Sequence, residues 1–193
     1  MVIVWTDPDR LASFLDAGVV LNVRLNASVK ANRAISANAG RKTSLTLQDC
    51  LNHFQQNEKL DKNNTWYCST CKEHKEAWKM MQIYSLPTVM VVQLKRFRNQ
   101  NGFRQKIGLP VVFPITGLDM GAYVLSAGSW VYDLFAVVNH LGDLGGGHYT
   151  AYAKHHLSGK WYLFDDSRVS LVENESSIIS TAAYILFYER RQK

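Results

Sequence analysis

The sequence has few cysteines and no long apolar run, and each shortage excludes a class of protein. Three cysteines, two of them in a Cys-x-x-Cys, do not suit the disulfide framework of a secreted domain. The apolar start, Met1–Trp5, is too short for a signal-peptide core or a membrane span. We therefore expect a protein of the reducing cell interior, cytoplasmic or nuclear, without a membrane partner.

The chain also lacks the dense positive charge of a dedicated nucleic-acid binder. Its net charge is +6, and the imbalance lies in residues 17–48, which contain no acidic residue. The basic residues of this segment are Arg24, Lys30, Arg33, Arg41 and Lys42. A nucleic-acid patch is one interpretation and a solvated linker is the better one, so we expect no nucleic-acid partner.

The length and apolar content allow one sizeable core, because 47% of the 193 residues are hydrophobic. Residues 1–23 predict a short strand, then a helix that Asp7 caps and Gly18 ends. Residues 24–42 are rich in Ala, Asn and Ser without an apolar period, which predicts a flexible basic connector. Residues 43–193 then form the main domain.

A helix is predicted to begin after Thr46, which can form a capping box with Asp49. The apolar residues that follow share one helical face: Leu47, Cys50, Leu51 and Phe54. Cys50 is therefore interpreted as a small core residue. As a nucleophile it would need an adjacent base and an electropositive site, which its neighbours do not supply.

Strand patterns dominate from Trp66 onward, with a tight hairpin expected at Asn101-Gly102. The predicted strands are Lys75–Tyr84, Thr88–Phe97, Phe103–Ile107, Val131–Asn139, Tyr149–Lys154, Lys160–Phe164, Arg168–Val172 and Tyr184–Tyr188. They predict an α+β fold, a mostly antiparallel sheet with short flanking helices.

Three consecutive glycines, Gly145 to Gly147, precede His148 at the start of a predicted strand. Glycine weakens strands, so the run makes sense where another backbone must approach closely. An imidazole on a rigid strand beside that channel suits a general base. A glycine-rich loop with an incidental histidine is an equally good interpretation of these residues alone.

Asp165 and Asp166 end the next aromatic strand, where paired acids are usually turn residues. The strands of His148 and Asp165 are joined by a turn at His155–Gly159, so antiparallel pairing brings His148 opposite the Asp165 region. A carboxylate beside an imidazole fixes its tautomer and stabilises the imidazolium. The third member of such a triad would be a serine or cysteine nucleophile.

Cys68 and Cys71 have the spacing of a zinc knuckle, but a structural zinc needs four ligands. The chain has no second Cys-x-x-Cys. His53 and His74 are conceivable substitutes, each with a plain surface interpretation as well.

Six segments, in order and spacing, resemble the C-terminal half of a ubiquitin-specific protease catalytic domain. They are TLQDCLNHF, WYCSTCKEH, LPTVMVVQLKRF, VYDLFAVVNHLGDLGGGHYTAYAK, WYLFDDSRVS and AAYILFYER. The start of the chain, VIVWTDPDR, also resembles the stretch that resumes this domain after a large insertion in some members. The resemblance makes residues 1–23 the initial strand and helix of the domain, and residues 43–193 its C-terminal part.

This resemblance implies a papain-like cysteine protease, of which the chain supplies most of the palm and part of the fingers. It implies that His148 is the general base, that Asp165 orients it, and that Asp166 is a second acidic group at the site. The residues that it assigns to the C-terminal tail of ubiquitin are His140, Gly145, Gly146, Gly147 and Tyr149. Cys68 and Cys71 match one pair of a four-cysteine zinc ribbon, so a structural zinc would take its other pair from outside this chain. No cofactor is implied for catalysis.

No segment resembles the family's cysteine box, which carries the nucleophile and an amide side chain for the oxyanion hole. We therefore expect the nucleophilic cysteine to lie in the N-terminal half of the domain, outside this chain, and the chain alone to be inactive. The expected substrates are ubiquitin and ubiquitinated proteins, cleaved after the last glycine of ubiquitin. One alternative is a catalytically inactive ubiquitin-binding or scaffold module. Another is a metal-dependent hydrolase with His140, His148 and Asp165 as ligands.

Overall fold

The computed structural model describes residues 2–3, 44–100, 103–143 and 145–192. The predicted initial strand is present as β1 (Val2–Ile3). The predicted first helix and the connector at 24–42 lie outside the described residues, as does the Asn101-Gly102 turn.

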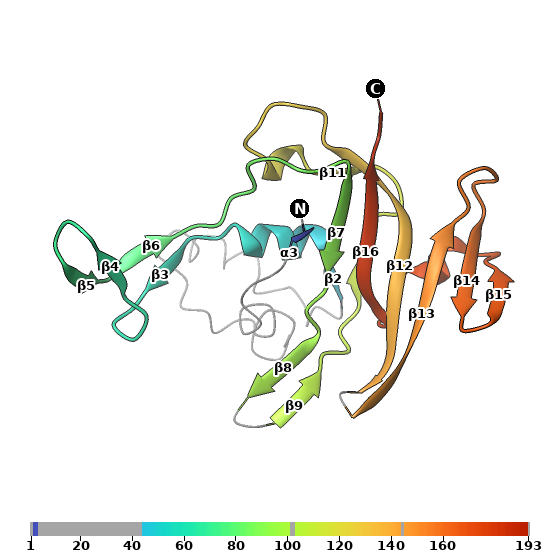
Figure 1. The fold of residues 1–193 in the computed structure, drawn as a ribbon, viewed down its shortest axis with the longest axis horizontal. Helices are drawn as coiled ribbons and strands as arrows, with labels where there is room; N and C mark the ends of the chain where they lie inside the picture. Colours follow the sequence, from blue (N-terminus) through green and yellow to red (C-terminus); the bar gives the residue numbers. More distant parts are fainter. Residues whose placement is uncertain (1, 4–43, 101–102, 144, 193) are drawn as a thin grey trace, which may run out of the picture.

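A twisted sheet forms the centre of the molecule (Figure 1), and its strand order is β1-β7-β16-β12-β13-β14-β15. Its long members are β12 (Val131–Asp143), β13 (Gly146–Lys154) and β16 (Ala183–Arg190). The shorter ones are β7 (Val89–Gln93), β14 (Trp161–Asp165), β15 (Arg168–Leu171) and β11 (Leu118–Asp119), which pairs with β12. Every pairing in this sheet is antiparallel except that of β1 with β7. The predicted mostly antiparallel α+β architecture is therefore confirmed.

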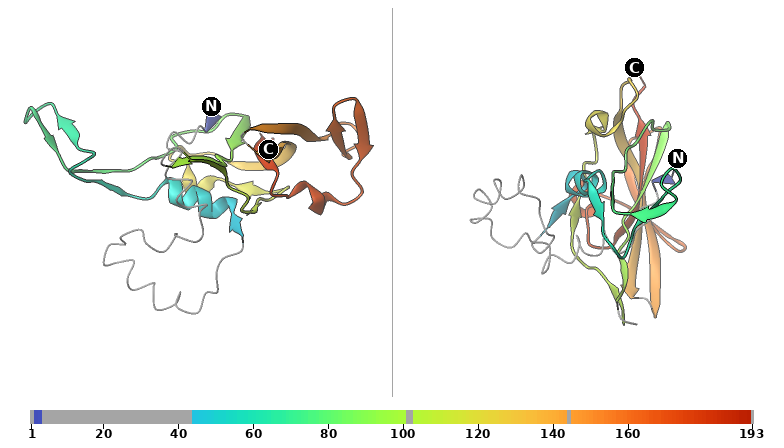
Figure 2. Two further views of the ribbon diagram at one scale, coloured as in Figure 1. Left: turned by 90° about the horizontal axis from the view of Figure 1, so that it is seen from below. Right: turned by 90° about the vertical axis from the view of Figure 1, so that its left-hand side faces the viewer.

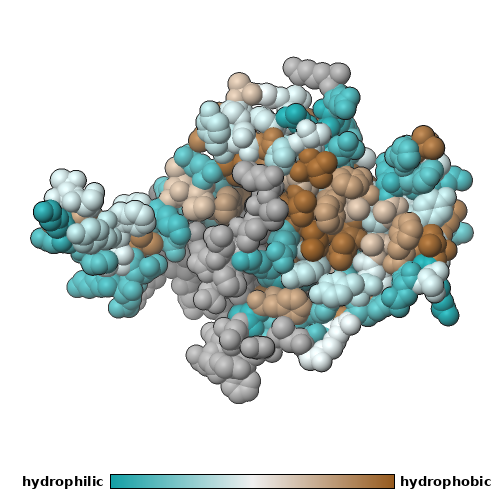
Figure 3. All heavy atoms as spheres, viewed as in Figure 1, coloured by the Kyte–Doolittle hydropathy of each residue, from teal (hydrophilic) through white to brown (hydrophobic). Residues whose placement is uncertain are grey.

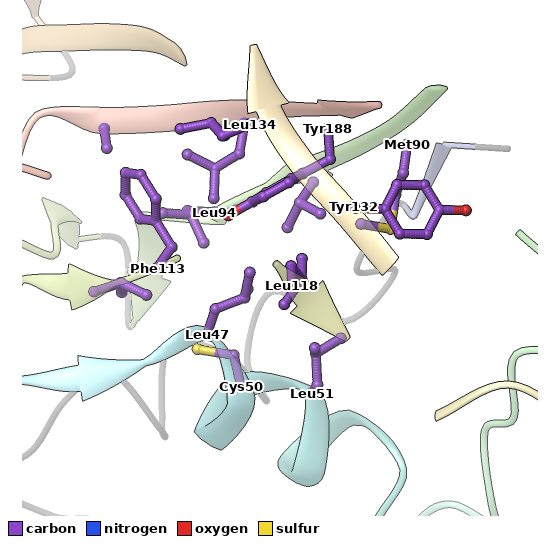
Figure 4. Packing of buried hydrophobic residues seen from close by; sticks show 14 of the residues in the cluster. Leu47, Cys50, Leu51, Met90, Leu94, Phe113, Leu118, Tyr132, Leu134 and Tyr188 are labelled. Carbon is purple, nitrogen blue, oxygen red and sulfur yellow. The ribbon is translucent and has the colours of Figure 1, made fainter. Parts of the chain in front are cut away.

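One helix, α3 (Leu47–Phe54), packs on one face of the sheet (Figure 2). The capping box forms as predicted, because the Asp49 amide donates to Thr46 Oγ1 at 3.0 Å and the Thr46 amide donates to Asp49 Oδ2 at 2.9 Å. Leu47, Cys50 and Leu51 are buried and belong to the same hydrophobic cluster as the core side chains of the sheet (Figure 4). Burial of one such leucine is worth about 1.5–3 kcal/mol, so the amphipathic face holds the helix in place.

The core face of the sheet follows the alternation of its strands, except that a register shift between Leu134 and Ala136 changes the phase within β12. Tyr132 and Val137 of β12 are fully buried, as are Leu186 and Tyr188 of β16. The opposite face is also apolar but more open, and Figure 3 shows apolar side chains gathered over the central strands. On that face lie the partly buried residues Val91, Val138, Ile185 and Phe187.

The remaining strands form small two-stranded sheets. β3 (Glu58–Leu60) pairs with β6 (Ala77–Lys79), and β4 (Trp66–Cys68) pairs with β5 (Glu73–Lys75), so that residues 58–79 project as an arm (Figure 1). β2 (Leu45–Thr46) pairs with β10 (Val111–Val112), and β8 (Phe97–Gln100) pairs with β9 (Phe103–Lys106). Two short 3-10 helices, Gly121–Tyr123 and Glu175–Ile178, complete the described elements.

Two predicted strands are interrupted. The stretch 75–84 is split because β5 and β6 pair with different strands, and Ile83 forms only an isolated bridge with Val124. The stretch 88–97 breaks after Gln93 because Arg96 turns inward. Its buried guanidinium donates to the carbonyl oxygens of Ala183, Ile107 and Leu109.

The hairpin of β12 and β13 extends further than predicted. The expected strands stop at Asn139 and start again at Tyr149, whereas the ladder continues through Gly142↔Gly147 to Asp143↔Gly146. Gly146 and Gly147 are therefore strand residues, so the alternative interpretation, a glycine-rich loop, does not hold for these two. No helix among the described residues is long and apolar enough to cross a membrane.

Candidate active site

His148 and Asp165 meet where two neighbouring strands stop pairing. The ladder of β13 with β14 closes at Ala151↔Phe164, so both residues lie just beyond its last pair. His148 Nε2 is 2.5 Å from Asp165 Oδ1, and the two side chains are 45% and 46% exposed. The hairpin geometry predicted from the sequence is confirmed, and the pair is open to a substrate.

Asp166 adds a second carboxylate to this pair. It lies in the turn between β14 and β15 with φ 49°, in the left-handed region that aspartate enters more readily than most residues. Ligand atoms of His148, Asp165 and Asp166 lie within 4.8 Å of one another. The two acids therefore act on one imidazole.

The charge distribution favours a protonated His148. The hydrogen bond with Asp165 is the largest effect and raises the pKa of His148; burial opposes it, and the negative charges of Asp165 and then Asp166 add smaller upward effects. Because Nε2 faces the carboxylate, it carries the donated hydrogen, and Nδ1 remains to exchange a proton with another group.

His140 lies on the other face of the same hairpin, paired with Tyr149, whereas His148 is paired with Leu141. Its ring is buried and contacts Tyr149 at a centroid distance of 4.8 Å and Phe97 at 5.3 Å. Burial lowers the pKa of His140, and the nearby Lys106 charge lowers it further. His140 is absent from the acidic cluster around His148, so the three-ligand metal site expected from His140, His148 and Asp165 does not assemble.

The three glycines differ in what surrounds them. A Cβ on Gly147 would overlap His140 Nε2 and lie 2.7 Å from the Leu141 carbonyl oxygen, so this glycine is required by the hairpin itself. A Cβ on Gly145 or Gly146 would have no described atom within 4 Å. The described atoms therefore leave open space around these two glycines, and Tyr149, which is 56% exposed, follows in the same strand.

Cys50 has the properties of a core residue, as predicted. It is 1% exposed, and burial, with a smaller effect from Asp49, raises its pKa to about 12. A thiol with that pKa stays protonated near neutral pH and is a poor nucleophile.

Cys68 and Cys71 lie at the turn between β4 and β5, at the far end of the arm from β13 and β14 (Figure 1). The Cys71 amide approaches Cys68 Sγ at 3.5 Å, and this contact is the largest cause of the lowered pKa of Cys68. A thiol held toward its thiolate form by a backbone amide suits a zinc ligand. Within the described residues no third His, Cys, Asp or Glu joins the two sulfurs, so they fit half of a tetrahedral site.

The nearby histidines have other contacts. His74 packs against Tyr67 with ring centroids 5.4 Å apart, and His53 Nδ1 is 3.1 Å from Gln56 Oε1. Zinc at the arm would therefore depend on ligands from beyond these residues.

Several neighbours of the site were not predicted. Leu141 shares the face of His148, Phe97 and Tyr184 surround His140, and Lys106 donates to the His140 carbonyl. Sequence alternation indicates which residues share a face of one strand. It does not indicate which distant strand lies alongside, and these contacts depend on that.

An antiparallel sheet beside one packed helix, with a histidine and an aspartate side by side on adjacent strands, is consistent with part of a papain-like α+β fold. The sequence model of the ubiquitin carboxyl-terminal hydrolase family matches residues 22–188. The chain therefore belongs to this family, as a ubiquitin-specific protease.

Curated relatives support this assignment. Ubiquitin carboxyl-terminal hydrolase 4 of Pongo abelii is 51% identical over 153 residues, which are 78% of this chain and 16% of that protein. Ubiquitin carboxyl-terminal hydrolase 15 of Homo sapiens is 43% identical over 187 residues, 96% of this chain and 18% of that protein. The chain thus spans less than a fifth of the length of these relatives.

Solved structures show the same fold. One is the SAGA Ubp8/Sgf11/Sus1/Sgf73 DUB module bound to ubiquitin aldehyde, with a TM-score of 0.66 and 34% sequence identity over 78% of this chain and 34% of that one. Another, of the yeast SAGA DUB module with an Sgf73 mutant, has a TM-score of 0.67 and 36% identity, with the same coverage.

Proposed function

We propose that this chain supplies the general base and its orienting carboxylate to a thiol-dependent deubiquitinase. The enzyme hydrolyses the isopeptide or peptide bond after the C-terminal glycine of ubiquitin. The observation that carries the proposal is the 2.5 Å contact between His148 Nε2 and Asp165 Oδ1 in a ubiquitin-specific protease fold.

In this mechanism Asp165 accepts the Nε2 hydrogen, which leaves Nδ1 of His148 as the base. Nδ1 takes the proton of a cysteine thiol, and the thiolate attacks the carbonyl carbon of the last glycine of ubiquitin. His148 then returns the proton to the leaving amine, and a thioester remains. Water, deprotonated by His148, hydrolyses the thioester and restores the thiol. Asp166 favours the imidazolium that forms in each half-reaction.

The nucleophile, in this proposal, is none of the three cysteines of the chain. Cys50 is buried with a pKa of about 12, and Cys68 and Cys71 lie on the arm, at the opposite end of the molecule from β14 (Figure 1). The nucleophilic cysteine belongs instead to the N-terminal half of the catalytic domain, outside this chain. The 193-residue chain alone is then inactive.

The proposed path of the ubiquitin tail runs along the open side of Gly145 and Gly146. The tail ends in glycines, and a narrow channel between two glycine segments excludes larger side chains. In this proposal Gly147, which packs closely against the His140 ring, forms the floor of the channel, and Tyr149 borders it. A related DUB module has been solved with ubiquitin aldehyde bound, which supports ubiquitin and ubiquitinated proteins as the partners.

Zinc has a structural role in this proposal and none in catalysis. Cys68 and Cys71 would hold the ion at the tip of the arm with two ligands from outside this chain, and it would brace the β4–β5 turn. The cytoplasm and the nucleus are the proposed compartments, since both keep thiols reduced.

The test is hydrolysis of a ubiquitin–fluorophore conjugate by the complete protein. His148→Gln should lower the rate by several orders of magnitude, whereas His156→Gln, at the exposed turn after β13, should not change it. A ubiquitin probe with a C-terminal electrophile should label the complete protein and leave the 193-residue chain unlabelled. Full activity of His148→Gln would refute the proposal. Ubiquitin binding without labelling or hydrolysis would instead support the inactive scaffold.

A further inference from the structure

One edge of β12 loses its neighbouring strand just before the active site. The pairing of β12 with β16 ends at Asn139↔Ala183, and the His140 amide makes the last contact, to the Ala182 carbonyl oxygen at 2.8 Å. In a strand, the N–H and C=O of one residue point to the same side, and every second residue repeats that direction. The carbonyl groups of His140 and Gly142 therefore face this edge, where the described residues provide no further strand.

Lys106, the last residue of β9, takes the place of the missing strand. Its Nζ donates to the His140 carbonyl oxygen at 2.6 Å and to the Gly142 carbonyl oxygen at 2.8 Å. The ammonium group thus donates to neutral backbone oxygens, and among the described residues it forms no ion pair. Burial, and then the charge of Arg96, lower the pKa of Lys106. Such a placement suits a group whose role is to hold the backbone.

The two carbonyl groups flank Leu141, whose cross-strand partner is His148. His148 lies beyond the end of the β13–β14 ladder, which closes at Ala151↔Phe164. Its backbone is therefore held by β12 alone, and β12 at this point is held on its outer side by Lys106. A shift of Gly142, which has φ +86° and pairs with Gly147, would move the whole end of the hairpin.

We propose that Lys106 is a positioning residue that clamps the end of β12 and keeps His148 in reach of Asp165. Its effect on catalysis rests on the proposed function, whereas its effect on the hairpin does not.

The test compares Lys106→Met, which keeps the length of the side chain and removes its donors, with Lys106→Arg, which keeps charge and donors. Lys154→Met, at the other end of β13, is the control. For the complete protein acting on a ubiquitin–fluorophore conjugate, Lys106→Met should lower kcat by about 10- to 100-fold, because a small misplacement of a catalytic group costs that much. KM should change less than twofold, and Lys106→Arg should recover most of kcat.

Two further readouts separate positioning from general stability. The amides of Leu141 and His148, which form a hydrogen-bonded pair by the same alternation, should exchange faster in Lys106→Met. The pKa of His148, followed by NMR, should fall because the Asp165 contact loosens. If Lys106→Met does not fold, Lys106→Gln takes its place with the same expected directions.

Unchanged kcat and unchanged exchange in the Met variant would overturn the proposal. So would an Arg variant as slow as the Met variant at equal thermal stability. If the Leu141 and His148 amides exchange faster in Lys106→Met while His148→Gln keeps full activity, the positioning role of Lys106 stands and the proposed function is rejected.

Discussion

Leu141 lies directly opposite His148 in the β12–β13 ladder, so the neighbour of the imidazole on its own face of the sheet is an exposed leucine. Side chains so paired have Cβ atoms about 5 Å apart. The acids that act on His148 therefore come from β14 and its turn, and the opposite flank is apolar.

Replacing Leu141 with aspartate should add a third negative charge beside His148. The pKa of His148, already raised, would rise further, and the acidic limb of the pH profile of kcat/KM would move to higher pH. Leu157→Asp, on the exposed turn after β13, adds the same charge away from the site and should leave the limb in place. Coincident profiles for the two variants would contradict this prediction.

Replacing Asp165 with asparagine should lower the pKa of His148 toward its ordinary value of 6.5, since the hydrogen bond to a carboxylate is its largest upward cause. Loss of the orienting charge should reduce kcat by about 10⁴-fold, as in other triads. NMR titration of the His148 ring measures the first effect and single-turnover hydrolysis the second. A wild-type rate in a folded Asp165→Asn protein would exclude the orienting role.

The same shift makes stability depend on pH in a stated direction. A histidine whose pKa is higher in the folded state than in the unfolded state stabilises the folded protein when it is protonated. This contribution is greatest below the pKa of the unfolded state, and it is lost as pH rises through the pKa of the folded state. Wild type should therefore exceed Asp165→Asn in unfolding free energy most clearly below pH 6.5, while Asp165 remains ionised. The gap should narrow above the raised pKa of His148, as urea unfolding across pH would show.

Gly147→Ala should destabilise the protein by about 2 kcal/mol, because the new methyl group overlaps the His140 ring and crowds the Leu141 carbonyl. Gly146→Ala is the matched control, since it is the adjacent strand glycine and its Cβ meets open space. Chemical denaturation distinguishes the two. Equal stability of both variants would mean that the His140 ring moves aside at little cost.

The three cysteines should differ in their reaction with iodoacetamide. Cys50, buried with a raised pKa, should stay unmodified in the folded protein, and Cys68, partly exposed with a lowered pKa, should react first. Zinc should slow modification of Cys68 and Cys71 where all four ligands are present.

Cys50→Ala should cost about 1–2 kcal/mol of stability and retain activity; a loss of activity at unchanged stability would reopen its catalytic role.

Local signals predicted the parts of the fold that are local. The helix Leu47–Phe54 follows from a capping box and an apolar period, both contained within one short segment. The contact of His148 with Asp165 was predictable because a short turn joins their strands.

Contacts between distant segments were not predictable in this way. The stretch 75–84 alternates like one strand, yet it breaks where the pairing partner changes, and alternation carries no information on partners. The roles of Arg96 and Lys106 depend on carbonyl groups far along the chain. The open side of Gly146 and the closed side of Gly147 look identical in sequence, and only the position of the His140 ring distinguishes them.

The two members of the proposed catalytic pair lie on neighbouring strands, His148 on β13 and Asp165 on β14. These strands are joined by the turn at 155–160 and pair over 151–154 and 161–164, so both residues lie beyond the end of the shared ladder. A hydrogen bond that starts at 2.5 Å is lost after a slide of about one ångström between them. The contact between His148 and Asp165 therefore depends on the relative position of the unpaired ends of β13 and β14, and a change there would be felt at this contact before it disturbed the buried core.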